Sequence, residues 1–238
     1  MTGRSTPFVL VMLMAGMATA GEGIDGRFGR TEVRYISAKP AIFHNGQKAF
    51  AIDDAQEAAI LRLMPEATKD FVLVQTWKPA QACPTSFHVL AIQAKTPLQA
   101  SPNFGVCADL AAMTFAGQYP VMHLRQTGAK KIEQLVWKDG KLFELPPVTE
   151  ACFAKHQQAI EKSNRQPPAA YLAAGEGRLQ FHSAPDEHCE IARTFVVPGD
   201  RLEASRVRGR FTLVFYQHPK AAKVAAGWVD STRLKPTT

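Results

Sequence analysis

The residue types that most often carry catalysis are scattered along this chain, with no spacing that would bring them together. The seven histidines form neither an HExxH nor an HxH pattern, and no serine stands in a GxSxG turn. Two acidic pairs exist, but Asp53–Asp54 opens an expected helix, and Asp186–Glu187 follows Pro185 in an expected turn. Neither pair suggests general acid catalysis. We therefore predict that the protein is not an enzyme and holds no metal or cofactor.

The chain contains four cysteines: Cys83, Cys107, Cys152 and Cys189. No two of them have CxxC spacing, and the neighbouring His88 and His188 complete no zinc-binding pattern. An even number of cysteines in an exported protein predicts disulfides, and three connectivities are possible. We favour Cys83 with Cys107, which share one expected hairpin region, and Cys152 with Cys189, which would fasten an expected helix to the second domain.

The first twenty residues read as a cleavable secretory signal. Arg4 and the amino terminus supply positive charge, the apolar run from Phe8 to Ala18 follows, and small residues lead up to a cleavage position between Ala20 and Gly21. The alternative is a membrane anchor, but an apolar run of this length is far shorter than a membrane-spanning helix. We expect an exported protein without an anchor, located in the periplasm or, alternatively, secreted.

The positive charge of the chain lies mainly in its carboxyl-terminal part. The formal net charge is +7, and residues 151–238 hold 13 basic against 8 acidic side chains, whereas residues 21–150 hold 14 against 13. In an exported protein such an excess indicates attraction to cell-wall polyanions, anionic lipid or an acidic protein rather than to nucleic acid. It is also common in proteins that have no such partner.

The elements expected between residues 21 and 147 form an antiparallel-sheet domain with one short helix. Asn45–Gly46 and Asp139–Gly140 predict tight hairpin turns. The segment Asp54–Met64 is rich in helix formers, and Pro65 would end it. We find no internal repeat. Strands are expected at residues 31–37, 41–52, 71–77, 87–92, 113–115, 121–125, 132–137 and 142–145.

A helical linker is expected at residues 148–168. Pro146–Pro147 would end the first domain, Val148–Ser163 has an apolar stripe at helical spacing, and Gln166–Pro168 would close the segment. The fold class that we predict is mainly β with some α: the amino-terminal sheet domain, this linker, and a small β-barrel at residues 169–238.

The carboxyl-terminal region carries four motifs of short strands joined by turns. They are GRLQFHSAP from Gly177, TFVVPGDRL from Thr194, GRFTLVFY from Gly209 and GWVDSTRL from Gly227. From about Tyr171 to Leu234 the chain resembles a bacterial SH3-like (SH3b-type) domain, of which GWV followed closely by RL is the most recognisable feature. The resemblance implies a small barrel that recognises a peptide or a glycan without chemistry. The domain before it resembles no family that we recognise.

Two groups of residues in this region are candidates for ligand binding. The resemblance points to aromatic and basic side chains of the barrel: Phe181, Tyr216, Trp228 and Arg233. A tryptophan in GWV is more often part of a barrel core, whereas Tyr216 and Arg233 suit the surface better. Arg206, Arg208 and Arg210 alternate along an expected strand, so their guanidinium groups would share one face and suit carboxylates or phosphates. The alternative is an edge strand protected by charge.

These observations favour a non-catalytic periplasmic binding or adaptor protein whose partner is peptidoglycan or an envelope protein, such as a wall hydrolase. A second interpretation is an inhibitor or immunity protein against a lysozyme-type enzyme or a delivered toxin. Modules similar to this SH3-like region also follow the amino-terminal domains of lysozyme-inhibitor-like periplasmic proteins, which supports that interpretation. A third is a wall hydrolase with SH3-like targeting, whose catalytic residues would then lie in the first domain.

Overall fold

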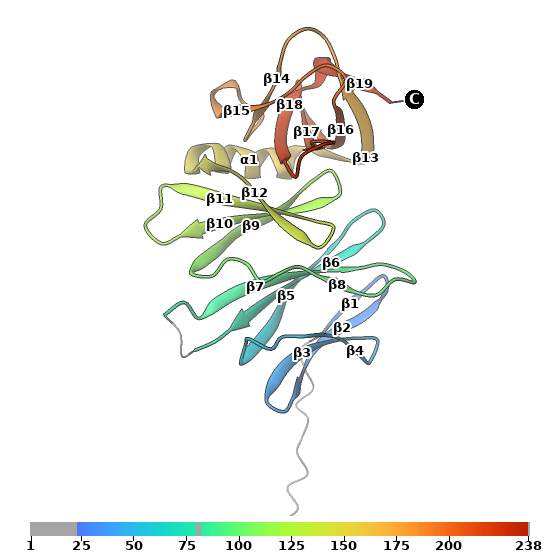
Figure 1. Cartoon of the computed structure of the whole chain (residues 1–238), viewed down its shortest axis with the longest axis vertical. Coiled ribbons are helices and arrows are strands. Elements are labelled where there is room, and N and C mark those ends of the chain that lie inside the picture. Colours follow the sequence, from blue (N-terminus) through green and yellow to red (C-terminus); the bar gives the residue numbers. More distant parts are fainter. Residues whose placement is uncertain (1–22, 80–81, 238) are drawn as a thin grey trace, which may run out of the picture.

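The computed structural model describes residues 23–79 and 82–237, and the expected leader with its cleavage position lies outside them. The described chain forms four antiparallel sheets and one α-helix. In Figure 1 the sheets lie one above another in chain order, with the helix between the third and the fourth. The two middle sheets therefore have a neighbour on each face.

Each of the first three sheets is a meander whose strands pair in sequence order. The first sheet holds β1 (Gly23–Gly26), β2 (Gly29–Ile36), β3 (Lys39–His44) and β4 (Gln47–Ala51). The second sheet holds β5 (Glu57–Pro65), β6 (Asp70–Trp77), β7 (Thr85–Ile92) and β8 (Gln99–Ala100). The third sheet holds β9 (Ala108–Ala116), β10 (Tyr119–Gln126), β11 (Lys131–Lys138) and β12 (Lys141–Thr149).

The carboxyl-terminal part begins with the helix α1 (Glu150–Lys162), which Thr149 caps by accepting a hydrogen bond from the Cys152 backbone nitrogen. Across the residues described, no helix is both long enough and apolar enough to cross a bilayer. The fourth sheet has the strand order β15-β14-β18-β17-β16-β13-β19. Its strands are β13 (Asn164–Ala173), β14 (Leu179–His182), β15 (Glu190–Val196), β16 (Arg201–Arg208), β17 (Phe211–Gln217), β18 (Val224–Asp230) and β19 (Leu234–Pro236), with single 3-10 turns at Glu187–Cys189 and Ser231–Arg233.

Apolar side chains on both faces of the inner sheets hold the stack together. On β6, Val72 and Val74 pack into the core shared with the first sheet. Phe71 and Leu73, which alternate with them, pack into the core shared with the third sheet. Each such buried side chain contributes about 1.5–3 kcal/mol. The fourth sheet instead curls around a core of its own, to which six of its strands contribute.

The predicted helix at Asp54–Met64 is wrong, because this segment forms strand β5. A β-bulge shifts its register against β6 between Ile60 and Arg62, so the apolar positions do not alternate regularly along the strand. Because the bulge interrupts the alternation of apolar and polar residues that indicates a strand, the helix-forming residues of this segment determined the prediction. Burial of Ile60 and Met64 between sheets outweighs that local preference.

The single amino-terminal sheet domain and the helical linker are also wrong. Three sheets take the place of one, and Pro146–Pro147 lies inside β12 instead of ending the last strand of the sheet. Proline is tolerated there because β12 is the edge strand of the third sheet. The helix expected at Val148–Ser163 does form, but Gln166–Pro168 belongs to β13, where a register irregularity between Arg165 and Ala169 accommodates the two prolines. The helix α1 therefore packs between the third and fourth sheets and does not act as a linker between separate domains.

The two expected hairpin turns are confirmed. Asn45 and Gly46 join β3 to β4, and both have positive φ angles, 50° and 78°. Asp139 and Gly140 join β11 to β12 with φ angles of 48° and 78°. Positive φ at both central residues is the mark of the primed turn, whose twist matches that of the strands it connects.

Two disulfides join segments that are distant in sequence. Cys83 is bonded to Cys107, across a separation of 24 residues, and Cys152 is bonded to Cys189, across 37 residues. These are the two pairs favoured from the sequence. The second bond ties α1 to the fourth sheet. Structural disulfides of this kind are typical of proteins that work in an oxidising compartment.

Two ion pairs join different layers of the stack, one between neighbouring sheets and one between sheets that are not adjacent. The Asp70 carboxylate, which is buried, pairs with Arg27 of the first sheet at 2.7 Å. Glu66, next to the end of β5, pairs with Arg165 of β13, and the Arg165 guanidinium also donates to the Pro65 carbonyl. The fourth sheet is therefore bonded to the second sheet directly, past the third. We call the pair Arg165–Glu66 the clasp.

Candidate functional site

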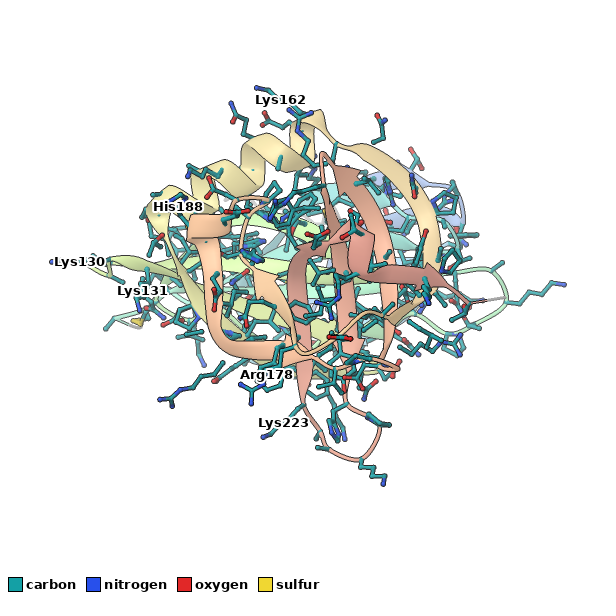
Figure 2. All side chains as sticks on the ribbon, turned by 90° about the horizontal axis from the view of Figure 1, so that it is seen from above. Lys130, Lys131, Lys162, Arg178, His188 and Lys223 are labelled. Atoms are coloured by element: carbon teal, nitrogen blue, oxygen red, sulfur yellow. A yellow bond between two sulfur atoms is a disulfide. The ribbon has the colours of Figure 1, made fainter. Side chains whose placement is uncertain are left out.

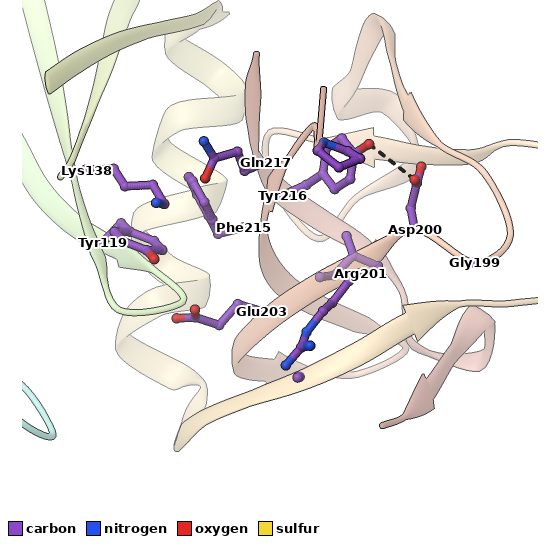
Figure 3. Close-up of a pocket in the computed structure, with 12 residues that line it drawn as sticks. Tyr119, Lys138, Gly199, Asp200, Arg201, Glu203, Phe215, Tyr216 and Gln217 are labelled. Carbon is purple, nitrogen blue, oxygen red and sulfur yellow. Dashed lines mark hydrogen bonds between the residues drawn. The ribbon is translucent and has the colours of Figure 1, made fainter. Parts of the chain in front are cut away.

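A groove of about 480 Å³ opens where the third sheet meets the fourth. Figure 3 shows Tyr119 and Lys138 on one side of it and Asp200 and Arg201 on the other. Its lining residues combine aromatic rings with both signs of charge: Tyr119, Lys138, Ala170, Gly199, Asp200, Arg201, Leu202, Glu203, Phe215, Tyr216, Gln217 and Pro219. A hollow of this size and character is typical of sites that hold a small ligand or a peptide segment.

The aromatic part of the groove is positioned by β10 and β17. The rings of Tyr119 and Phe215 pack together with their centroids 4.4 Å apart, and the Lys138 ammonium lies 5.2 Å from the Tyr119 ring centroid. On β17, Phe215 packs toward the third sheet and Tyr216 packs into the core of the fourth. The Tyr216 hydroxyl still reaches the Asp200 carboxylate, 3.2 Å away (Figure 3).

Both carboxylates of the groove are already engaged by hydrogen bonds from the protein. Asp200 accepts from the Tyr216 hydroxyl and, at 2.9 Å, from the Val197 backbone nitrogen. Glu203 accepts from the backbone nitrogen of Gln118 at 2.6 Å and from its side-chain amide at 3.2 Å. These bonds fasten the turn between β9 and β10 to β16, so the two acids hold the walls of the groove in place.

Arg201 is the basic group of the groove that remains available. Its side chain is exposed, and its guanidinium makes no hydrogen bond or ion pair with any residue in the described part of the chain. Lys138, by contrast, is paired with Asp139. A guanidinium can donate two parallel hydrogen bonds to a carboxylate. The groove therefore offers a cation beside aromatic surface, which suits a ligand that has a carboxylate next to an apolar part.

The two tyrosines of the groove remain protonated at neutral pH. Burial raises the pKa of Tyr119, and the nearby Glu203 carboxylate raises it further. Burial likewise raises the pKa of Tyr216, with a second contribution from the Asp200 carboxylate. Both hydroxyls are therefore hydrogen-bond donors rather than nucleophiles.

Of the seven candidates named from the sequence, Tyr216 alone lines this groove. Phe181 and Trp228 are fully buried, and the Trp228 indole donates to His156 Nδ1 at 3.1 Å inside the junction of α1 with the third and fourth sheets. Arg233 donates to the Ala174 carbonyl, and at a longer distance to that of Gly177, so it holds a loop rather than facing a groove.

The arginine stripe contacts other parts of the protein. Arg206 donates to the Ile160 carbonyl at 3.3 Å and to Ser163 Oγ at 3.2 Å, and Arg208 donates to the Lys162 carbonyl at 3.4 Å. These are the last groups of α1, whose carbonyls have no partner within the helix. Arg210 pairs with Glu187. Two members of the stripe therefore bind the negative end of the helix dipole.

Replacing Arg206 and Arg208 together by Gln is expected to lower the free energy of unfolding by about 1–2 kcal/mol, because the helix end loses its cationic partners. Urea unfolding followed by circular dichroism measures the change, and Arg210→Gln, at the exposed pair with Glu187, is the matched control with a smaller effect. Sedimentation with purified peptidoglycan should be unchanged. An unaltered unfolding curve together with lost sedimentation would restore the stripe as a ligand site.

The basic side chains labelled in Figure 2 do not gather in one place. Figure 2 looks onto the carboxyl-terminal end of the molecule, and the labelled basic residues point outward around the rim in several directions. They are Lys130, Lys131, Lys162, Arg178, His188 and Lys223. The labelled groups therefore define no single surface for an anionic polymer.

Most of the groove could not be found from the sequence. Tyr119 and Lys138 lie in the segment assigned to the first domain, more than sixty residues before Arg201, and no motif connects them with it. Asp200 ends the PGD turn motif and Arg201 follows it, and the motif gives no sign that the two residues line a groove. The alternation of Phe215 and Tyr216 on β17 was the available signal, because successive residues of a strand face opposite sides.

Within residues 23–79 and 82–237, no group of three or more His, Cys, Asp or Glu side chains is arranged to hold a metal ion, and every cysteine is in a disulfide. Comparisons with protein families, with curated proteins and with solved structures find no match for this chain. Its function must therefore be inferred from the arrangement of residues in the groove.

Proposed function

We propose that this chain is an exported, non-catalytic binding protein that holds a carboxylate-bearing peptide of an envelope ligand in the groove between the third and fourth sheets. The observation that carries the proposal is the exposed Arg201 guanidinium, without a partner among the described residues, beside the rings of Tyr119 and Phe215. The resemblance of residues 171–234 to an SH3-like domain supports the same role, since it implies recognition without chemistry. The two disulfides support a place in an oxidising compartment.

The peptide stems of peptidoglycan are the ligand that we favour, because they present free carboxylates beside short apolar side chains. Replacing Arg201 by Gln is expected to weaken binding of soluble, stem-peptide-containing wall fragments by about tenfold or more. Calorimetric titration measures this change. Chemical amidation of the carboxylates should weaken binding to the unaltered protein to a similar extent, and should have little further effect on the Arg201→Gln variant.

Arg62→Gln is the matched control, because Arg62 is exposed on β5 and its side chain makes no hydrogen bond or ion pair with described residues. It should bind as the unaltered protein does. Equal affinity of native and amidated fragments would contradict the proposal. Protection of lysozyme-treated cells in a turbidity assay, with no binding of wall fragments, would replace it by the inhibitor interpretation.

A further inference from the structure

A second hollow lies between the first and second sheets, at the opposite part of the molecule from the groove. It measures about 420 Å³ and is lined by residues of β2, β5, β6 and β7 and by the residue before β7: Tyr35, Glu57, Ala58, Ala59, Gln75, Thr76, Trp77, Pro84 and Thr85. All of these belong to the described chain. We call it the cleft. We propose that the cleft is a binding site for an uncharged saccharide, stacked on Trp77 and Tyr35.

Two large aromatic side chains are exposed together in the cleft. Trp77 is 46% exposed and Tyr35 is 49% exposed, and both line it. The other two tryptophans, Trp137 and Trp228, are almost completely buried in the cores. Tryptophan is highly buried on average in folded proteins, so an exposed tryptophan beside an exposed tyrosine indicates a surface that something else covers.

The cleft is held in shape before any ligand arrives. Trp77 is paired in the ladder with Glu57 on one side and Thr85 on the other, and its carbonyl accepts from the Gln56 nitrogen at 2.9 Å. Pro84 follows Cys83, whose disulfide to Cys107 anchors the start of β7. The Tyr35 hydroxyl lies 3.5 Å from the Ala58 nitrogen. A rigid site of this kind loses little conformational entropy on binding.

The polar groups of the cleft determine which ligand chemistry it can match. The lining contains Glu57, Gln75 and Thr85 but no Lys, Arg or His, so nothing in it compensates a phosphate, sulfate or carboxylate. Thr76 is already bonded to Ser86. The Glu57 carboxylate accepts hydrogen bonds only, and it therefore requires a ligand that donates them. The hydroxyl groups of a sugar donate, and the C–H faces of its ring pack on the electron-rich faces of aromatic rings.

A proline-rich peptide is the closest competitor, because such peptides also bind aromatic-lined grooves. Their prolines lack backbone N–H groups and present carbonyl oxygens, which are acceptors. Such a segment would leave the Glu57 carboxylate facing other acceptors. The charge and hydrogen-bonding character of the cleft thus favours the saccharide.

The tryptophan distribution provides a direct test with the whole protein. Because Trp77 is the exposed one of the three tryptophans, a ligand in the cleft should shift the exposed component of the fluorescence and shield it from acrylamide. The probe is a soluble oligomer of β-1,4-linked N-acetylglucosamine, and a proline-rich peptide is the comparison. We expect a saturable change with the oligosaccharide and none with the peptide.

Calorimetry then measures the affinity of the variants for the same oligosaccharide. Trp77→Ala is expected to weaken binding by about thirtyfold, as loss of a central aromatic anchor does, and Trp77→Phe to weaken it less. Glu57→Gln should weaken it severalfold without changing the fold. Leu61→Ala is the matched control, because Leu61 is an exposed apolar residue of the same sheet that does not line the cleft.

Circular dichroism shows that a variant is folded before its affinity is compared. Absence of a saturable signal, an unchanged affinity in the folded Trp77→Ala variant, or a response to the proline-rich peptide alone would each overturn the inference. Arg201→Gln should leave oligosaccharide binding unchanged. The proposal for the groove and the proposal for the cleft can therefore be contradicted independently of each other.

Discussion

Acidification from pH 7 to pH 4 is expected to lower the free energy of unfolding by about 3 kcal/mol through His156 alone. Burial lowers the pKa of His156 from 6.5 to about 4; the nearby Ser183 backbone acts in the opposite direction, and the nearby Arg206 lowers the pKa further. Burial also lowers the pKa of His123, and the neighbouring His156, 5.2 Å away between ring centroids, lowers it further. Both rings are therefore neutral in the folded protein at neutral pH.

Proton binding in the folded and unfolded states gives the direction of the effect. Below pH 6.5 the unfolded chain protonates these histidines and the folded protein does not, so stability is complete above pH 6.5 and is lost as the pH falls toward 4. The Asp186 carboxylate titrates in a separate range, because hydrogen bonds from Lys155 and His188 lower its pKa to about 2. Urea unfolding at a series of pH values measures the loss.

His156→Gln is the variant that tests this assignment, since an amide can still accept the hydrogen bond from the Trp228 indole but does not titrate. Its stability should depend on pH less steeply between 6.5 and 4, because His123 is then the one histidine of this buried pair that still titrates. The exposed His188, which sits on the surface beside Asp186, is the control, and His188→Gln should keep the steep dependence. Equal slopes in His156→Gln and the unaltered protein would show that the loss arises elsewhere.

Removal of the Cys152–Cys189 disulfide is expected to lower the free energy of unfolding by about 3–4 kcal/mol. The bond joins residues that are 37 positions apart in the sequence. A cross-link over a loop of that length lowers the conformational entropy of the unfolded chain, which stabilises the folded protein by about this amount. Cys189 is buried, so alanine is the appropriate replacement at both positions. Urea unfolding of the double variant under oxidising conditions measures the effect.

Replacing Cys83 and Cys107 by alanine provides the comparison. The shorter separation of 24 residues predicts a slightly smaller loss of stability. This variant should also weaken oligosaccharide binding, because Cys83 precedes Pro84 of the cleft, whereas the Cys152–Cys189 variant should not. Unfolding curves that coincide with that of the unaltered protein would mean that neither bond contributes to stability.

Local features of this fold could be predicted, whereas the way its layers divide could not. Asn45–Gly46 and Asp139–Gly140 specify their turns through residues that tolerate positive φ, and the helix near residues 150–162 is indicated by the spacing of its apolar residues. The division into three stacked sheets depends on which faces meet, and an inner sheet that is apolar on both faces has no simple alternating pattern. The bulge in β5 removed the remaining signal.

For the two proposed binding sites, single residues could likewise be named from the local sequence, whereas the contacts between sheets could not be predicted. Tyr216 was named because it stands in a recognisable strand, but Tyr119 and Lys138, which line the groove with it, come from another sheet. Trp228 and Phe181 were named for their aromatic character, which is the property that places them in cores. Trp77 has the same character, yet it lies at a strand end beside a loop, where the layers leave it uncovered.

The clasp changes how the stack can come apart. A stack of layers in which each layer contacts only its neighbours behaves as a one-dimensional array. Such an array can unfold from either end, with one interface opening at a time. The Arg165–Glu66 pair connects the fourth sheet to the second and so bypasses the third sheet. The fourth sheet therefore cannot separate from the third without also breaking the Arg165–Glu66 pair. Separation at this end then requires the interface with the third sheet and the contact with the second sheet to open together.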